Sequence, residues 1–221
     1  MSVTVAIIGA GPLGRWLALS AARAGFRVLL EDVMPANLHH AQEALRAVLG
    51  PQQAVDESSS VSGHGFSHAA INATKSRALA PEERVFFVST IEEAVRNADL
   101  VIDCVPDELE SKLEILWLLD RMAPPRAVLA TPTTRLSITD LAHCTYRPTK
   151  CIAIAAEARA LTGKTEAAAS REIQLCTTPQ TAPDTVALLD HFWRQLGFTP
   201  IFALDPGPPT GELTTIDPAL K

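Results

Sequence analysis

The stretch VTVAIIGAGPLGRWLALSAARAGFRVLLED, residues 3–32, decides the fold of this chain. Residues 3–8 form an apolar, β-branched run without a polar break, as is typical of a parallel strand buried on both faces. Apolar residues then recur at helical spacing up to Gly25, where a helix can end. A second apolar run, residues 27–30, completes a strand–helix–strand unit.

The turn between the first strand and the helix has the Gly-x-Gly-x-x-Gly spacing. The first glycine allows a tight turn, the second lets a pyrophosphate approach the backbone, and the third lets helix and strand pack closely. The N-terminus of the helix adds amide donors and the positive end of the helix dipole. The pattern therefore predicts a dinucleotide site whose contacts at this turn are Gly9, Gly11, Pro12, Leu13 and Gly14.

Asp32 follows the second strand, where an acidic residue can accept hydrogen bonds from the adenosine ribose. The same carboxylate would repel a 2′-phosphate, so the sequence favours NAD over NADP. Glu31 also lies at the end of this strand and leaves a flavoprotein as a weaker alternative, although no other feature suggests a flavin site.

Composition limits the remaining function classes. The chain has 221 residues, 47% of them hydrophobic, which suits one large α/β domain or one domain with an appendage. The net charge is −6 and there is no basic block, so nucleic-acid binding has little support. We find no apolar run long enough to span a bilayer and no room for a signal peptide before the first strand, so we expect a cytoplasmic protein.

No metal site is predicted. His64 and His68 are four residues apart, but Gly65 and the serine-rich loop 52–66 favour solvent-exposed histidines over metal ligands. The cysteines lack the spacing of metal ligands, and we expect reduced thiols, mostly in the core. These cysteines are Cys104, Cys144, Cys151 and Cys176.

Beyond the loop, strands and helices alternate. This order predicts an α/β fold with a doubly wound, mostly parallel sheet, the Rossmann-type dinucleotide-binding fold. We expect one domain over residues 1–205 and a proline-rich tail over 206–221. The expected strands are 85–88, 100–105, 127–130, 151–155, 172–176 and 199–203, and the expected helices are 35–49, 90–98, 107–122, one starting at 137, and 182–196.

Several motifs together resemble the NAD-binding domain of the 3-hydroxyacyl-CoA dehydrogenase family over most of residues 3–207. Besides the opening stretch, they read ADLVIDCVPDELESK, APPRAVLATPTTRLSITDLA and RPTKCIAIAAE. The resemblance implies an oxidoreductase related to fatty acid metabolism, with NAD as cofactor, a small acyl or keto substrate and a homodimer or partner subunit.

The resemblance also places individual residues. It puts Asp107 and Lys112 near the cofactor, and Thr134 close to nicotinamide and substrate. The departures from the family at this point are Pro132 for an asparagine and Arg135 for a serine. The alternative for Asp107 and Lys112 is a solvated helix N-terminus with an exposed lysine.

The catalytic positions depart most from the family. The family has a histidine that accepts the hydroxyl proton and a glutamate that orients it, and this sequence has Ala155 and Gln174 at those positions. Losing a positioned general base typically removes about 10²- to 10⁴-fold in rate. The family continues into a helical domain, whereas residues 206–221 predict a loose tail that could dock on a partner.

Two functional hypotheses follow. In the first, an NAD-dependent oxidoreductase uses another acid–base group, and we predict Thr134 and Glu157 as its catalytic residues. A surface ion pair between Glu157 and Arg159 is the alternative for that carboxylate, and Tyr146 and His143 are further candidates. In the second, the chain binds NAD without catalysis, as a sensor or as a subunit that needs a partner.

Overall fold

The computed structural model describes residues 3–49, 84–156, 161–162 and 171–205. The strands are β1 Thr4–Ile8, β2 Arg27–Glu31, β3 Val85–Val88, β4 Leu100–Asp103, β5 Val128–Pro132, β6 Cys151–Ile154, β7 Glu172–Thr177 and β8 Thr199–Leu204. The helices are α1 Pro12–Arg23, α2 Pro35–Leu49, α3 Ile91–Val95, α4 Leu109–Met122, α5 Ile138–His143 and α7 Pro183–Gln195, with a short 3₁₀ turn, η2, at Pro148–Lys150.

Within the described residues, eight strands form a single sheet in the order β3-β2-β1-β4-β5-β6-β7-β8. Every neighbouring pair is parallel except β6 and β7, which run antiparallel. The predicted doubly wound, mostly parallel sheet is therefore confirmed. Because β1 lies near the middle of the sheet, both of its faces are covered, which explains its apolar run at residues 5–8.

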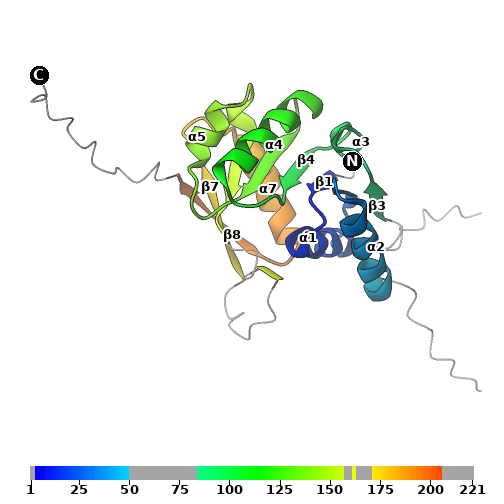
Figure 1. Ribbon diagram of the computed structural model, residues 1–221. Helices are drawn as coiled ribbons and strands as arrows, with labels where there is room; N and C mark the ends of the chain where they lie inside the picture. Colours follow the sequence, from blue (N-terminus) through cyan, green and yellow to red (C-terminus); the bar gives the residue numbers. More distant parts are fainter. Residues whose placement is uncertain (1–2, 50–83, 157–160, 163–170, 206–221) are drawn as a thin grey trace, which may run out of the picture.

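Helices cover both faces of the sheet (Figure 1). On one face α1, α2 and α7 pack against residues such as Val5 and Ile7. On the other face α3, α4 and α5 pack against the alternate residues, such as Ala6 and Ile8. The strand alternation thus gives the sheet two separate apolar cores. No helix in the described part of the chain is long and apolar enough to cross a membrane.

Most element boundaries match the sequence within one or two residues; β4, expected over 100–105, ends at Asp103, and α3 and α4 also differ. The predicted start of α3 is confirmed, because the Thr90 hydroxyl accepts a hydrogen bond from the Glu93 amide. The helix ends earlier than expected, at Val95. α4 begins at Leu109 rather than Asp107, because Glu108 has extended backbone angles and serves as the N-cap. Asp107 therefore lies in the loop before α4.

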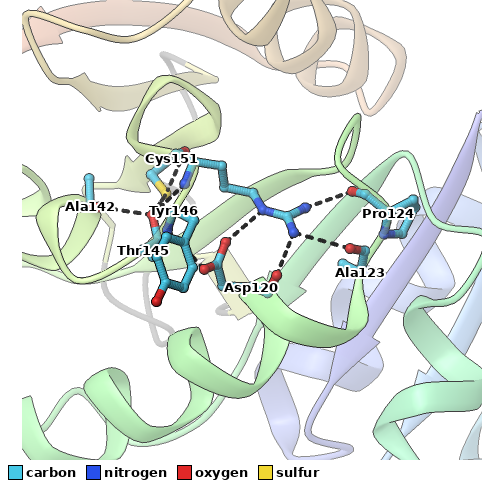
Figure 2. Close-up of polar contacts among 8 residues, drawn as sticks. Asp120, Ala123, Pro124, Ala142, Thr145, Tyr146 and Cys151 are labelled. Atoms are coloured by element: carbon cyan, nitrogen blue, oxygen red, sulfur yellow. Dashed lines mark hydrogen bonds and ion pairs between the residues drawn. The ribbon is translucent and has the colours of Figure 1, made fainter.

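Arg147 fixes the other end of α4 (Figure 2). Its Nε donates to Asp120 Oδ1 at 2.7 Å, while its Nη atoms donate to the carbonyls of Pro124 at 2.6 Å and Ala123 at 3.1 Å. The amide of Tyr146 donates to the second Asp120 oxygen at 2.8 Å. Since α4 connects two parallel strands, its C-terminus lies at the edge of the sheet opposite the carboxyl ends of the strands. Tyr146 belongs to that opposite edge.

Candidate functional site

The glycine turn has the geometry that its sequence predicts. Gly9 has a φ of +106°, a region that side chains other than glycine rarely adopt. At Gly14 an added Cβ would lie 1.8 Å from the carbonyl oxygen of Gly9, so no side chain fits between helix and turn. An added Cβ at Gly11 would meet no atom within 4 Å. The turn is therefore closed toward the protein and open toward the space where a pyrophosphate would bind.

Asp32 lies beside this turn. Its Oδ2 accepts a hydrogen bond from the Ala10 amide at 2.7 Å, and its Oδ1 accepts one from the Met34 amide at 2.8 Å. Asn37 Nδ2 adds a longer contact of 3.2 Å to Oδ1. Asn37 Nδ2 also lies 3.4 Å from Oδ2, so these contacts use the roughly four lone-pair positions of the carboxylate. A ribose hydroxyl would therefore replace the long, exposed contacts of Asn37. The structure brings the two halves of the predicted dinucleotide site together.

An open cleft of about 810 Å³ continues from the glycine turn along the carboxyl ends of β1, β4, β5 and β6. Ligands of doubly wound sheets bind at this edge. Five of the predicted site residues line it, namely Gly11, Pro12, Leu13, Asp107 and Thr134. The other lining residues are Cys104, Val105, Pro106, Pro132, Thr133, Arg135, Ala156 and Thr162.

Asp107 connects two walls of this cleft. Its Oδ2 accepts a hydrogen bond from the Thr134 amide at 3.2 Å, and its carbonyl accepts one from Arg135 Nη2 at 2.5 Å. Its Oδ1 is buried and has no hydrogen-bond partner among the described residues. Asp107 is therefore not the solvated helix end of the alternative interpretation, because it joins the loops that follow β4 and β5.

Lys112 lies in a buried ion pair next to the cleft residue Cys104. Its side chain is fully buried, and Nζ lies 2.5 Å from Oδ1 of Asp103, whose side chain is also fully buried. The exposed lysine of the alternative interpretation is therefore wrong. Lys112 does not line the cleft, so a direct contact with the cofactor would require a rearrangement of its surroundings. Burial raises the pKa of Asp103, and the charge and hydrogen bond of Lys112 oppose that rise.

Ala155 and Gln174, which the sequence resemblance matches to a histidine and a glutamate of the family, lie opposite each other. The antiparallel register pairs Ala153 with Cys176 and Ile154 with Leu175. One residue further, the amide of Ala155 donates to the carbonyl of Gln174 at 2.9 Å. The next residue, Ala156, lines the cleft, so this cross-strand pair borders the site.

The other acid–base candidates fall elsewhere. Tyr146 is 92% exposed at the opposite edge of the sheet, and His143 lines a separate cavity of about 230 Å³. Neither residue borders the cleft, so the structure does not bring them to the expected site. Glu157 and Arg159 lie outside the described residues, as do His64, His68 and the tail 206–221.

Three titratable side chains line the described part of the cleft, those of Cys104, Asp107 and Arg135. Burial, followed by the charge of Asp103, raises the pKa of the Cys104 thiol, so it stays protonated at neutral pH. All four cysteines are free thiols; Cys151 is buried, whereas Cys144 is exposed and not a core residue. The described residues contain no group of three or more histidine, cysteine or acidic side chains that could hold a metal ion.

Glu31, the last residue of β2, predicts a pH dependence of stability. Its side chain is 3% exposed, and burial, then the neighbouring charge of Asp32, raise its pKa from 4.5 to about 7. Between these pH values the native state holds more protons than the unfolded state, so this group's contribution to stability falls as the pH rises from 4.5 through 7. Glu31→Gln removes the titration.

The free energy of unfolding of Glu31→Gln should therefore increase relative to that of the wild type as the pH rises from 5 to 8. Other titrating groups are shared by the two proteins and cancel in the difference. Urea unfolding followed by circular dichroism at four pH values measures the difference between the two proteins. Parallel pH profiles for the variant and the wild type would contradict this assignment for Glu31.

A known protein family matches almost all of the residues described above. The family described as 3-hydroxyacyl-CoA dehydrogenase, NAD binding domain, matches residues 4–205. The chain belongs to this family. NAD is the cofactor of 3-hydroxyacyl-CoA dehydrogenases, and the open space at Gly11 and the acceptor capacity of Asp32 fit it.

Two curated relatives match different lengths of the chain. A probable 3-hydroxybutyryl-CoA dehydrogenase of Bacillus subtilis is 33% identical over 148 residues, which are 67% of this chain and 46% of the relative. The 5-formyl-3-hydroxy-2-methylpyridine 4-carboxylate 5-dehydrogenase of Mesorhizobium japonicum is 27% identical over 198 residues, which are 89% of this chain and 56% of the relative. The chain thus spans about half the length of these relatives.

A solved structure shares the fold. The (S)-3-hydroxybutyryl-CoA dehydrogenase of Ralstonia eutropha superposes with a TM-score of 0.70 at 21% sequence identity, covering 93% of this chain and 64% of that chain. At this identity the likeness concerns the fold alone. It agrees with the mostly parallel sheet and its flanking helices.

Sequence reasoning missed two features of the site. Asp103 is the buried partner of Lys112, and Arg135 is the cation in the cleft wall. The sequence signal for Asp103 was a single acidic residue within the otherwise apolar run expected as a strand over 100–105. For Arg135 the signal was a charged residue in place of a small one, next to the predicted Thr134.

Proposed function

We propose that this chain binds NAD(H) in the cleft and does not dehydrogenate hydroxyacyl-CoA by the family's histidine–glutamate proton transfer. The observation that supports this proposal most is the cross-strand neighbourhood of Ala155 and Gln174. A methyl group cannot accept a proton, and a neutral amide cannot stabilise a charged imidazole. The two substitutions occupy adjacent places beside the cleft, as a histidine and its orienting glutamate would.

The residues that remain are those of cofactor binding. The amides at the start of α1 would hold the pyrophosphate, and Asp32 would accept a hydrogen bond from the adenosine ribose. Asp107 lines the cleft, and its buried Oδ1 would become an acceptor for a ribose hydroxyl or amide if the carboxylate turned toward the ligand. Bound NAD would supply a hydride acceptor. The proposed role is that of an NAD(H) sensor, or of a subunit that needs a partner.

A second candidate is an oxidoreductase that uses a different acid–base group. Thr134, whose side chain lies in the cleft wall, and Glu157, which follows the cleft residue Ala156 in sequence, are the groups we propose for it. Its substrate would carry a hydroxyl or keto group, as the names of the relatives suggest.

One series of measurements separates these functions. The purified chain is titrated with NADH by calorimetry, and the oxidation of NADH is then followed by absorbance with acetoacetyl-CoA and with small keto acids. We expect NADH binding without turnover of acetoacetyl-CoA. Turnover that falls by about 10²-fold or more in Glu157→Gln would favour the second candidate. If NADH does not bind at millimolar concentration, neither function holds.

A matched gain-of-function test uses Ala155 and Gln174. The double variant Ala155→His with Gln174→Glu restores both family side chains, and each single variant serves as its control. If the missing pair limits the reaction, the double variant should turn over acetoacetyl-CoA faster than either single variant. Equal rates in all four proteins would argue against the assignment of these two positions.

A further inference from the structure

Arg135 gives the cleft a positive group beyond the turn that holds the pyrophosphate. It is the one cationic side chain among the described residues that line the cleft. Its backbone is fixed, because the buried hydroxyl of Thr133 accepts hydrogen bonds from the amides of Arg135 at 3.3 Å and Leu136 at 3.0 Å. The guanidinium is thus carried by an ordered turn at the carboxyl end of β5.

Most of the donor capacity of this guanidinium is uncommitted. Nη2 donates to the carbonyl of Asp107. Nε forms an ion pair with Asp107 Oδ2 at 3.9 Å, which partly balances the positive charge but is too long for a hydrogen bond. That oxygen accepts instead from the Thr134 amide. The Arg135 side chain is 71% exposed. An arginine has five N–H donors in a planar fork, so several remain for an oxygen-bearing anion.

The position of Arg135 separates it from the pyrophosphate site. The glycine turn follows β1, and Arg135 follows β5, with β4 between these two strands. Neighbouring strands lie about 4.8 Å apart, so the two loops are about 10 Å apart across the sheet. Ala156, after β6, lies on the Arg135 side of the cleft. An anion at Arg135 therefore lies next to the part of the cleft where the family carries out its chemistry.

We infer that Arg135 forms a subsite for the carboxylate of a small acid, bound beside NAD in the same cleft. This inference rests on the proposed binding of NAD(H). A guanidinium pairs with a carboxylate through two parallel N–H···O bonds, which gives the ligand a fixed orientation. With Ala155 and Gln174 at the border, the acid is held without a general base from that strand pair. The names of the relatives, which include 3-hydroxybutyryl-CoA dehydrogenases, suggest a short-chain 3-oxo or 3-hydroxy acid as the ligand class.

The test compares a carboxylate with its uncharged ester. Acetoacetate and methyl acetoacetate are titrated by calorimetry into the wild type, with and without saturating NAD⁺, which cannot oxidise the 3-oxo group further. The same titrations are run on Arg135→Gln and on Arg126→Gln. Arg126 is a matched control, because it pairs with Asp99 through Nε at 2.9 Å and does not line the cleft.

We expect acetoacetate to bind the wild type and Arg126→Gln at least about tenfold more tightly than it binds Arg135→Gln, the ratio that a charge-assisted hydrogen bond supplies. The ester should bind the wild type as weakly as acetoacetate binds Arg135→Gln, and the dissociation constant of NADH should stay the same in all three proteins.

Equal binding of acid and ester, or no binding of acetoacetate, would overturn the subsite. A tenfold loss of NADH affinity in Arg135→Gln would assign the residue to the cofactor phosphates instead. Absence of NADH binding in the wild type would refute the proposed function, and titration without cofactor would still test the subsite.

Discussion

Replacement of Lys112 by methionine should lower the free energy of unfolding by about 3–5 kcal/mol, the usual result of removing one member of a buried ion pair. Lys112 and Asp103 are both fully buried, with Nζ 2.5 Å from Oδ1. Thr131 and the Val105 amide also lower the pKa of Asp103, but neither forms a hydrogen bond of normal geometry with its second oxygen in the described structure. Without the ammonium, the carboxylate would be left in the apolar layer between β4 and α4. Urea unfolding followed by circular dichroism measures the loss.

The pH supplies an internal check on this prediction. Burial raises the pKa of Asp103, and Lys112 opposes that rise. In Lys112→Met, Asp103 should therefore keep its proton up to a higher pH than in the wild type. A carboxyl whose folded pKa is raised stabilises the native state below its unfolded pKa and loses that contribution as the pH rises through the folded pKa. The loss of unfolding free energy in Lys112→Met, relative to the wild type, should therefore be smallest at acidic pH and increase toward neutral pH.

Two further variants complete the comparison. Lys150→Met removes a lysine whose partner, Asp184, is exposed, and it should change the urea midpoint little. The double variant Asp103→Leu with Lys112→Met replaces both charges by apolar groups and should recover much of the loss. If Lys112→Met unfolds at the same urea concentration as the wild type at neutral pH, the pair is not a pair of opposite charges in solution.

The buried pair also shows where sequence reasoning ends. Periodicity places Asp103 in a strand and Lys112 in the first turns of a helix, and both elements are confirmed, although the strand ends at Asp103 and not at residue 105. Whether the lysine points to solvent or toward the strand depends on the conformation of the loop 104–108, which joins β4 to α4. The local spacing of apolar residues does not determine that conformation. The same limit applies to Arg135 and Asp107, which meet only because β4 and β5 are neighbours in the sheet.

The glycine turn and Asp32 were predictable in full, because the interactions that define them are local. Gly9, Gly11 and Gly14 lie within six residues of one another, and their backbone requirements are written into the spacing. Asp32 is fixed by the parallel register of β1 and β2, which pairs Ile8 with Glu31. A strand–helix–strand unit has essentially one hand, so this register follows from the order of the elements.

Gly14→Ala should prevent the native packing of α1, whereas Gly11→Ala should leave the fold intact and weaken only the binding of NADH. The added methyl of Gly14→Ala would lie 1.8 Å from the backbone carbonyl of Gly9, which cannot move aside as a flexible side chain could. We expect a loss of more than about 3 kcal/mol, above the usual cost of overpacking, or a chain that does not fold. Thermal unfolding by circular dichroism measures it.

Gly11→Ala is the matched variant, because its methyl would meet no atom within 4 Å and its φ of −65° suits alanine. Its free energy of unfolding should stay within about 1 kcal/mol of that of the wild type, since the restricted unfolded chain offsets a poorer N-cap. The methyl would project into the cleft at the place where the pyrophosphate must touch the backbone, so the dissociation constant of NADH should rise at least about tenfold. A stable Gly11→Ala protein with unchanged NADH affinity would show that the dinucleotide does not lie against this turn. Equal stability of the two variants would show that α1 has room to retreat from β1.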